Sequence, residues 1–195
     1  MRKALLVTLV FVFCGVYAVA QDYHKGELSA GWNYLHFDTG AGTGGATESS
    51  TDGFYVDGTY YFKRYLGLTA RFDYNKKTFD AGTITAVTTD AGTHSLLFGP
   101  RFKAHFGRVE PFVHGLFGFT RLGLTPKGQG EESDTAFAMK FGGGVDVGVA
   151  KHFGVRVGEF DYFMTRFNNA TNPDLNLNGK GTQNNWTISA GIVIH

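Results

Sequence analysis

The sequence predicts an all-β fold, an eight-stranded antiparallel up-and-down barrel, and three observations support this prediction. First, the chain has 19 Phe, 9 Tyr and 28 Gly but only 4 Pro, a composition that favours strands joined by flexible turns. Second, successive segments alternate between apolar and polar residues, with the period of a β-strand. Third, long loops rich in Gly, Thr, Ser and Asn alternate with tight turns, which is typical of a meander of hairpins.

The chain begins with a segment that has the features of a secretory signal peptide. A basic start is followed by an apolar run over residues 4–16 and by a small-x-small cleavage pattern at 18–20. The apolar run is too short for a membrane span and ends in small residues. We therefore expect residues 1–20 to be cleaved and residues 21–195 to form the barrel domain.

The composition of the remaining chain excludes several classes of function. The single cysteine, Cys14, lies inside the predicted signal, so the mature chain has no disulfide framework and no thiolate nucleophile or zinc ligand. Without Arg2 and Lys3, the 18 basic residues become 16, against 17 acidic residues. This near-neutral balance gives no electrostatic footprint for nucleic acid, and we expect no nucleic-acid partner.

The first four predicted strands alternate clearly. In the third of them, Leu68, Ala70 and Phe72 share one face, whereas Arg71 and Asp73 share the other. These four strands are expected at residues 27–37, 54–62, 66–74 and 94–106.

The second half of the chain contains four more candidate strands. Residues 109–122 are apolar on both faces, so the sequence does not show which face of this strand points inwards. In the next strand, Phe141 and Val145 lie on one face, and Lys140 and Asp146 lie on the other. Six residues separate these two charges, about 20 Å of strand, and we do not expect them to pair. These strands are expected at residues 109–122, 137–149, 153–167 and 186–194.

The seventh predicted strand changes phase along its length. Arg156 has one parity, whereas Glu159 and Asp161 have the other. A β-bulge near Gly158 would bring all three charges to the same face, because a bulge adds one residue to the strand. We therefore predict a bulge there.

The connections are asymmetric. Long loops are expected near 38–53, 75–93, 124–135 and 168–185, and tight basic turns at 63–64, 107–108 and 151–152. Arg64, Arg108 and His152 are each 44 residues apart (64 to 108 and 108 to 152). Long loops at one end, short turns at the other and strands of about 9–11 residues are typical of an outer-membrane barrel. Eight strands place both termini at the end with the short turns.

The alternative fold is a soluble, lipocalin-like barrel, whose polar face would meet water. The polar face of this chain instead carries glycines and isolated charges of both signs. A small barrel has an interior just wide enough to be filled by side chains. The apolar face is therefore predicted to meet lipid, with aromatic girdles that include Tyr60, Phe62, Tyr65, Phe106 and Phe153. The predicted interior charges, which we expect to pair and plug the barrel, are Glu27, Asp57, Arg71, Asp73, Arg101, Lys103, Lys140, Asp146, Arg156, Glu159 and Asp161. A narrow, low-conductance ion path between them is the alternative.

No segment predicts a catalytic, cofactor or metal site. His94 and Ser95 are adjacent in a strand and point to opposite faces, so they do not form a simple catalytic pair. The glycines at 142–144 are not followed by the residues of a phosphate loop. His114 is interpreted as a hydrogen-bonded interior or interfacial group, and Arg71 and Arg101 are the candidate partners of Asp146.

Several segments resemble the small outer-membrane β-barrel proteins of the OmpA transmembrane-domain and OmpX type. They are YHKGELSAGWNYLHF, FGPRF, PFVHGLFG, FGGGVDV and the terminal WTISAGIVIH. The resemblance implies a Gram-negative outer membrane, a surrounding bilayer with lipopolysaccharide, and insertion by the barrel-assembly machinery. It also implies a non-enzymatic structural or surface-interaction protein with four extracellular loops, of which residues 39–52 and 168–185 are candidate ligand contacts. A lipid A-modifying outer-membrane enzyme is a further alternative, and no cofactor is implied.

One feature departs from this resemblance. Family members usually end in an aromatic residue that the assembly machinery reads, whereas this chain ends Ile194-His195. We expect either that one further residue belongs to the chain or that its insertion signal is weakened.

Overall fold

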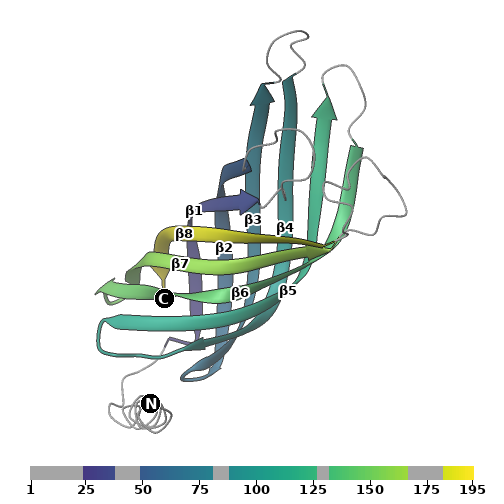
Figure 1. The fold of residues 1–195 in the computed structure, drawn as a ribbon. Helices are drawn as coiled ribbons and strands as arrows, with labels where there is room; N and C mark the ends of the chain where they lie inside the picture. Colours follow the sequence, from purple (N-terminus) through teal and green to yellow (C-terminus); the bar gives the residue numbers. More distant parts are fainter. Residues whose placement is uncertain (1–23, 38–48, 81–87, 127–131, 167–181) are drawn as a thin grey trace, which may run out of the picture.

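Eight antiparallel strands form one closed barrel, which confirms the predicted fold class. The computed structural model describes residues 24–37, 49–80, 88–126, 132–166 and 182–195. Each strand pairs with its neighbours in sequence, and the first pairs with the last to close the sheet (Figure 1). The strands are β1 (Gly26–Phe37), β2 (Ser49–Lys63), β3 (Leu66–Asp80), β4 (Thr88–Lys103), β5 (Val109–Pro126), β6 (Glu132–Ala150), β7 (Phe153–Arg166) and β8 (Thr182–Ile194). No helix long and apolar enough to cross a membrane occurs among the described residues.

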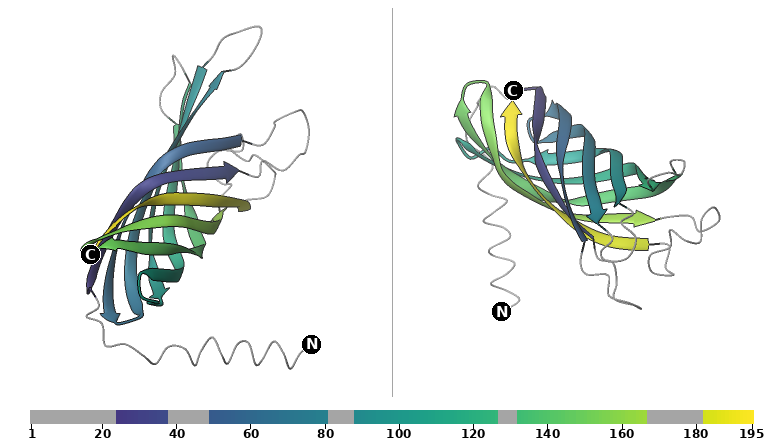
Figure 2. Two further views of the ribbon diagram at one scale, coloured as in Figure 1. Left: turned by 90° about the vertical axis from the view of Figure 1, so that its left-hand side faces the viewer. Right: turned by 90° about the horizontal axis from the view of Figure 1, so that it is seen from above.

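Both ends of the barrel wall lie where the short turns are. β1 begins beside the end of β2, with Gly26 opposite Tyr60, and β8 ends with Ile194 opposite Leu28 and Phe153. Figure 2 shows the C-terminus at this end of the barrel. The predicted signal peptide at 1–20 and most of the loop segments 39–52 and 168–185 lie outside the described residues.

Several strands differ in length from the sequence prediction. β3 continues to Asp80, and β4 starts at Thr88, although a loop was predicted over 75–93. These residues are rich in Thr, Gly and Asp and lack an apolar alternation, but their backbone groups pair in a regular ladder that ends with Asp80 opposite Thr88. Backbone pairing does not depend on side-chain polarity, which is why the pattern missed this extension.

The fourth strand ends earlier than predicted, at Lys103 rather than at residue 106. The chain turns here because the Phe106 amide donates to the Val109 carbonyl (2.9 Å) and the Ala104 amide donates to the Pro111 carbonyl (2.9 Å). Gly107 has a φ of 66°, in the left-handed region that side-chain-bearing residues avoid. A glycine at this position therefore permits the tight turn.

The outer face of the barrel is apolar, as expected for a surface that meets lipid. Leu68 is 58% exposed, Val113 59% and Phe160 58%, and many other large apolar side chains also lie outside. Aromatic side chains are exposed around the short-turn end, namely Tyr60, Phe62, Tyr65, Phe106 and Phe153. A water-soluble barrel would show the opposite distribution, because exposed apolar area is unfavourable in water.

A second group of aromatic side chains lies further along the strands, towards the long loops. The rings of Trp32 and Tyr34 on β1 have centroids 5.9 Å apart, and Tyr34 is equally close to Trp186 on β8. On two other strands, β3 and β4, the centroid of the Tyr74 ring lies 4.8 Å from that of the His94 ring. Aromatic residues at both ends of an apolar band match the two interfaces of a bilayer.

The predicted bulge in β7 is confirmed. Val145 of β6 pairs with Gly158, whereas the next residue, Asp146, pairs with Arg156, so that β7 has one residue more than β6 at this point. The register with β8 shifts at the same place, between Arg156 and Glu159. Both charged side chains are consequently buried, and Val157 between them is 65% exposed towards lipid.

We expect the barrel to tolerate deletion of Val157, because this removes the extra residue and restores regular alternation between Arg156 and Glu159. Deletion of Phe160, on the same strand, should prevent folding, since it makes Glu159 and Asp161 neighbours and turns a charge towards lipid. Heat-modifiable migration of the detergent-refolded variants on gels reports barrel closure. Equal folding of both variants, or folding of the Phe160 deletion alone, would show that the bulge does not set the register.

Candidate functional site

The buried polar side chains inside the barrel are the candidate functional site. The structure places all eleven charges singled out in the sequence at the barrel interior, each no more than 5% exposed: Glu27, Asp57, Arg71, Asp73, Arg101, Lys103, Lys140, Asp146, Arg156, Glu159 and Asp161. Alternation along the strands produces this arrangement, because every second side chain points to the axis.

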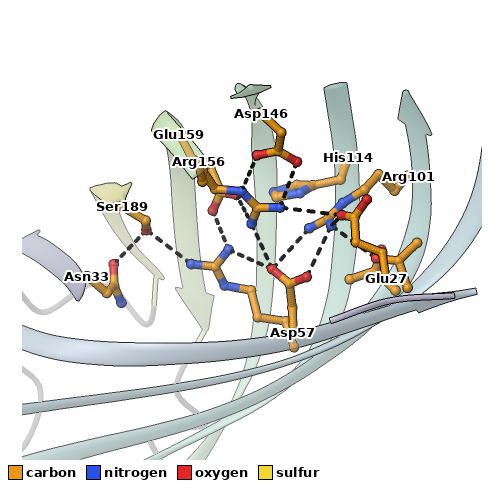
Figure 3. Close-up of polar contacts among 12 residues, drawn as sticks. Glu27, Asn33, Asp57, Arg101, His114, Asp146, Arg156, Glu159 and Ser189 are labelled. Atoms are coloured by element: carbon orange, nitrogen blue, oxygen red, sulfur yellow. Dashed lines mark hydrogen bonds and ion pairs between the residues drawn. The ribbon is translucent and has the colours of Figure 1, made fainter. Parts of the chain in front are cut away.

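Arg156 on β7 lies at the centre of these charges. Its guanidinium donates to Asp146 on β6 (Nε to Oδ1, 2.8 Å), to Asp57 on β2 (Nη1 to Oδ2, 2.8 Å) and to Glu159 (Nη1 to Oε2, 2.9 Å). Figure 3 shows the three carboxylates around this one cation. Arg156 therefore joins strands that lie on different sides of the barrel.

Asp57 accepts hydrogen bonds from two arginines, and a third, Arg71, lies 3.8 Å from its Oδ2. Arg101 on β4 donates to both of its oxygens, from Nη1 to Oδ1 (3.1 Å) and from Nη2 to Oδ2 (3.2 Å), and Arg156 donates to the second oxygen (Figure 3). Bidentate arginine–carboxylate pairs fix orientation as well as charge. Arg101 Nη1 also donates to Thr59 Oγ1 (3.0 Å), which is a neutral acceptor on the same strand as Asp57.

A third arginine continues the network towards the long-loop end. Arg71 donates from Nε to Asp73 Oδ1 (2.8 Å), and it also pairs with Glu159. Its Nη2 donates to Ser189 Oγ (3.1 Å), and the Ser189 hydroxyl donates to Asn33 Oδ1 (3.2 Å) on β1. Neutral side chains thus extend the polar network to the strands that close the barrel.

The far end of the network holds Lys140 and His114. Lys140 Nζ donates to Asp73 Oδ2 (2.9 Å) and lies 3.9 Å from Asp161 Oδ2. His114 Nε2 lies 3.0 Å from Asp161 Oδ1, so the interpretation of His114 as a hydrogen-bonded interior group is confirmed. The next strand comes so close that a Cβ at Gly142 would collide with Asp161 and with the Phe160 backbone, which explains a glycine there.

The other end of the network opens towards the short turns. Lys103 pairs with Glu27, donates to Asp146 Oδ2 (2.8 Å) and reaches Glu110 Oε2 at 3.5 Å. Burial lowers the pKa of the neighbouring His105 imidazole below its usual range, against the opposing effect of Glu110. Burial lowers the pKa of His195 in the same way, although Glu27 acts against it.

The prediction of the ion-pair partners of Asp146 was wrong. The sequence pointed to Arg71 and Arg101, whereas Asp146 contacts Arg156 and Lys103. Asp146 stands directly opposite Arg156 in the β6–β7 ladder, and the alignment depends on the bulge. As expected, Lys140 and Asp146 do not pair with each other, since each has other partners.

Aromatic rings inside the barrel were missed in the sequence. The Arg71 guanidinium lies 4.3 Å from the centre of the Tyr55 ring, and the Arg156 and Arg101 guanidiniums lie 4.5 Å and 4.7 Å from the Phe112 ring. Tyr55 shares the parity of Asp57, which was an available signal. Phe112 lies in the strand whose phase was ambiguous; in the structure its even-numbered positions from 112 to 116 point inwards.

A layer of apolar side chains also lies inside the barrel, in addition to the charges. Leu97 on β4 and Leu116 on β5 are fully buried, and Leu116 lies opposite Lys140 in the ladder. The whole cluster comprises Leu35, Leu97, Leu116, Ala138 and Phe163. Except for Leu116, in the strand of ambiguous phase, their parity matched that of the interior charges, but apolar residues were expected to face lipid, so this layer was overlooked.

The interior can bind and orient charges, and His94 and Ser95 do not form a catalytic pair. Ser95 is buried, and its hydroxyl donates to Thr120 Oγ1 (2.9 Å), whereas His94 is exposed on the outer face beside Tyr74. The two residues therefore point to opposite sides of the wall, as their adjacency predicted.

Comparisons with known proteins agree with this geometry. Neisserial surface protein A has a similar structure, with a TM-score of 0.64 and 11% identity over 89% of this chain and 99% of that one. Ail, the attachment invasion locus protein of Yersinia pestis, has a TM-score of 0.56 and 16% identity over 88% of this chain and 99% of its own. Both similarities are at the level of the fold.

The sequence comparison is more specific. No curated protein matches the chain significantly. Residues 6–192, however, match the family described as the outer membrane protein beta-barrel domain, which covers almost the whole chain. The protein is therefore a Gram-negative outer-membrane β-barrel and belongs to the outer membrane protein beta-barrel domain family.

Proposed function

We propose that this protein is a non-enzymatic membrane anchor that presents a β-sheet at the cell surface, while its own side chains plug its interior. The observation that carries the proposal is the buried charge network. Arg71, Arg101 and Arg156 are all 0% exposed and are held by carboxylates from several strands. A closed interior leaves the ends of the barrel for interaction.

A plug is favoured over a pore by the way the cations are enclosed. An ion path requires water along the barrel axis, whereas Arg156 reaches carboxylates on β2 and β6 and packs against the Phe112 ring of β5. The apolar cluster of Leu35, Leu97, Leu116, Ala138 and Phe163 adds a second barrier. Opening a path would leave buried charges without partners, which costs several kcal/mol per ion.

Four strands extend beyond the others at the end with the long loops. β2 pairs with β3 only as far as Asp52 opposite Lys76, whereas the β3–β4 ladder continues to Asp80. On the other side, β6 begins its pairing with β7 at Phe137, whereas its ladder with β5 reaches Glu132. Figure 1 shows β3, β4, β5 and β6 rising above the rest of the wall.

This extension has an outer edge suited to recognition. Residues 77–80 of β3 pair with β4 on one side, and no ladder on their other side is formed by the described residues. Such an edge can add a strand from a partner, because its backbone N–H and C=O groups are available for hydrogen bonds. We propose that this edge, together with the loop segments 39–52 and 168–185, contacts an extracellular ligand.

The similar structures are consistent with a role at the surface. Ail is described as an attachment and invasion protein, and one of its structures, with a TM-score of 0.53 and 15% identity, contains a heparin analogue. We further propose export by cleavage of residues 1–20, insertion by the barrel-assembly machinery and a position in a membrane that contains lipopolysaccharide. The enzyme alternative gains no support from the separated His94 and Ser95 side chains.

The plug predicts that the purified barrel gives no reproducible conductance steps in planar lipid bilayers. Its interior cations are paired, so no continuous water path exists for ions. Arg71→Ala should introduce or increase such steps, whereas Arg108→Ala in an exposed short turn should not. Regular steps in the unmodified protein that Arg71→Ala or Asp146→Ala abolishes would establish a pore instead.

The network also predicts a large stability effect at its centre. Arg156→Met should lower the free energy of unfolding by about 3–5 kcal/mol, because Asp57, Asp146 and Glu159 lose a shared partner while remaining buried. Urea titration of the barrel in lipid vesicles measures this change, with Arg108→Ala as the exposed control. A loss of less than about 1 kcal/mol, the range of an exposed pair, would contradict the assigned role.

The surface role predicts that shortening the extension abolishes adhesion but not folding. Residues 78–90 would be replaced by Asn-Gly, which forms a tight hairpin turn. Bacteria that display this variant should bind less to cultured epithelial cells and to heparin-coated plates than bacteria with the unmodified protein. Arg108→Ala, at the opposite end, should bind normally. Unchanged adhesion by a correctly inserted, shortened variant would exclude this edge as the contact.

A further inference from the structure

A cavity opens inside the barrel at the end with the short turns. Its volume is about 400 Å³, and it lies between the start of β1, the β4–β5 turn and the chain end after β8. Its lining includes two carboxylates, Glu27 and Glu110, and three imidazoles, His24, His105 and His195. The charged network described above forms its floor, because Glu27 pairs with Lys103 and Arg101.

Ligand atoms of three of these residues converge, and His105 approaches one of the three. Ligand atoms of Glu27, Glu110 and His195 all lie within 4.8 Å of one another. His195 Nδ1 is 3.8 Å from Glu27 Oε2, and His105 Nε2 is 3.9 Å from Glu110 Oε1. These separations exceed a hydrogen bond and leave room for an ion that draws the ligands together. We call Glu27, His105, Glu110 and His195 the rim cluster.

The charge balance of the interior favours a bound cation. The ion pairs among the described residues join five cations, Arg71, Arg101, Lys103, Lys140 and Arg156, to seven carboxylates, the six predicted ones and Glu110. Without counting the histidines, the formal charge of this group is 5 − 7 = −2. Glu110 is the most weakly paired of these acids, because its contacts with Lys103 and His105 are 3.5 Å and 3.9 Å long.

We propose that the rim cluster binds one divalent transition-metal ion of the Zn²⁺ class. Two imidazoles and two carboxylates form a ligand set that suits Zn²⁺, whereas Mg²⁺ and Ca²⁺ prefer oxygen ligands alone. The charge of the ion would offset the excess of carboxylates. The side chains of the cluster remain accessible from the cavity, since those of His105, Glu110 and His195 are 20%, 17% and 11% exposed.

One basic residue, Lys103, contacts both carboxylates of the cluster, Glu27 and Glu110, through their Oε2 atoms, whereas three other basic residues around the cavity do not pair with them. Arg64, Arg108 and Lys151 line the rim, and no ion pair joins them to Glu27 or Glu110 among the described residues. Arg108 and Lys151 are exposed to solvent, so water and salt screen their repulsion of a cation. Lys103 approaches Glu110 from Oε2 and His105 approaches it from Oε1, so an ion bound on the imidazole side would use Glu110 Oε1 and would have the Lys103 ammonium, which also holds Glu27 Oε2, as its neighbour.

A metal ion here would act at the seam of the barrel. Glu27 lies on β1 and His195 directly follows β8, the two strands whose pairing closes the sheet. Glu110 lies on β5, across the opening. An ion bound only by the folded state stabilises that state by mass action. Binding would therefore tie the first and last strands to the opposite wall.

The test uses the full mature barrel, refolded in detergent without a histidine tag, because a tag would itself bind metal. Calorimetric titration with ZnCl₂ should show one ion per barrel, and Co²⁺ should give the visible absorption of a low-symmetry nitrogen–oxygen site. His195→Ala and Glu110→Gln should each weaken Zn²⁺ binding by at least about tenfold. His94→Ala, an exposed histidine on the outer wall, is the matched control and should bind as the unmodified protein does.

A second readout separates binding from damage to the fold. Each variant must first show the gel migration of a closed barrel, and Zn²⁺ should then slow urea unfolding of the unmodified protein and of His94→Ala only. MgCl₂ at the same concentration should have no effect. The proposal is overturned if the closed, unmodified barrel binds no Zn²⁺, or if closed His195→Ala and Glu110→Gln barrels bind it as tightly as the unmodified protein.

Discussion

The contacts of Arg156 are the interaction on which the rest of the interior depends. One guanidinium joins carboxylates of β2, β6 and β7, and those carboxylates lead to Arg71, Arg101 and Lys103. A charge in a barrel of this size has two alternatives, a partner across the lumen or exposure to lipid, and lipid is far more costly. The network therefore fixes the register of the strands, since a slip of one residue would turn its charges outwards.

The two ends of the barrel offer different groups to their surroundings. At one end, β3 to β6 extend as a sheet whose edge offers backbone hydrogen-bonding groups. At the other end, a cavity lined by imidazoles and carboxylates meets the start of β1 and the end of β8. The wall between them is apolar outside and carries the buried charges inside, as expected of a barrel that spans one bilayer.

Alternation and the asymmetry between long loops and short turns together predicted the strand number, the membrane location and the inward orientation of the charges, because a β-strand has a period of two whatever its neighbours are. The β7 bulge was also predictable, since Arg156 and Glu159 differ in parity and both avoid lipid. The prediction of strand length and orientation was poorer where polar and apolar side chains do not alternate. The ladder beyond residue 75 depends on backbone pairing, and the inward phase of β5 was hidden because apolar residues occupy both faces.

The sequence by itself determined which side chains face the axis, since parity is a local property of each strand. Only the tertiary structure decided which of them meet. Asp146 contacts Arg156 and Lys103 rather than Arg71, because the bulge and the stagger of the strands set the height of each residue along the axis. The same closure brings Glu27, Glu110 and His195 together from β1, β5 and the chain end, positions that no local pattern connects.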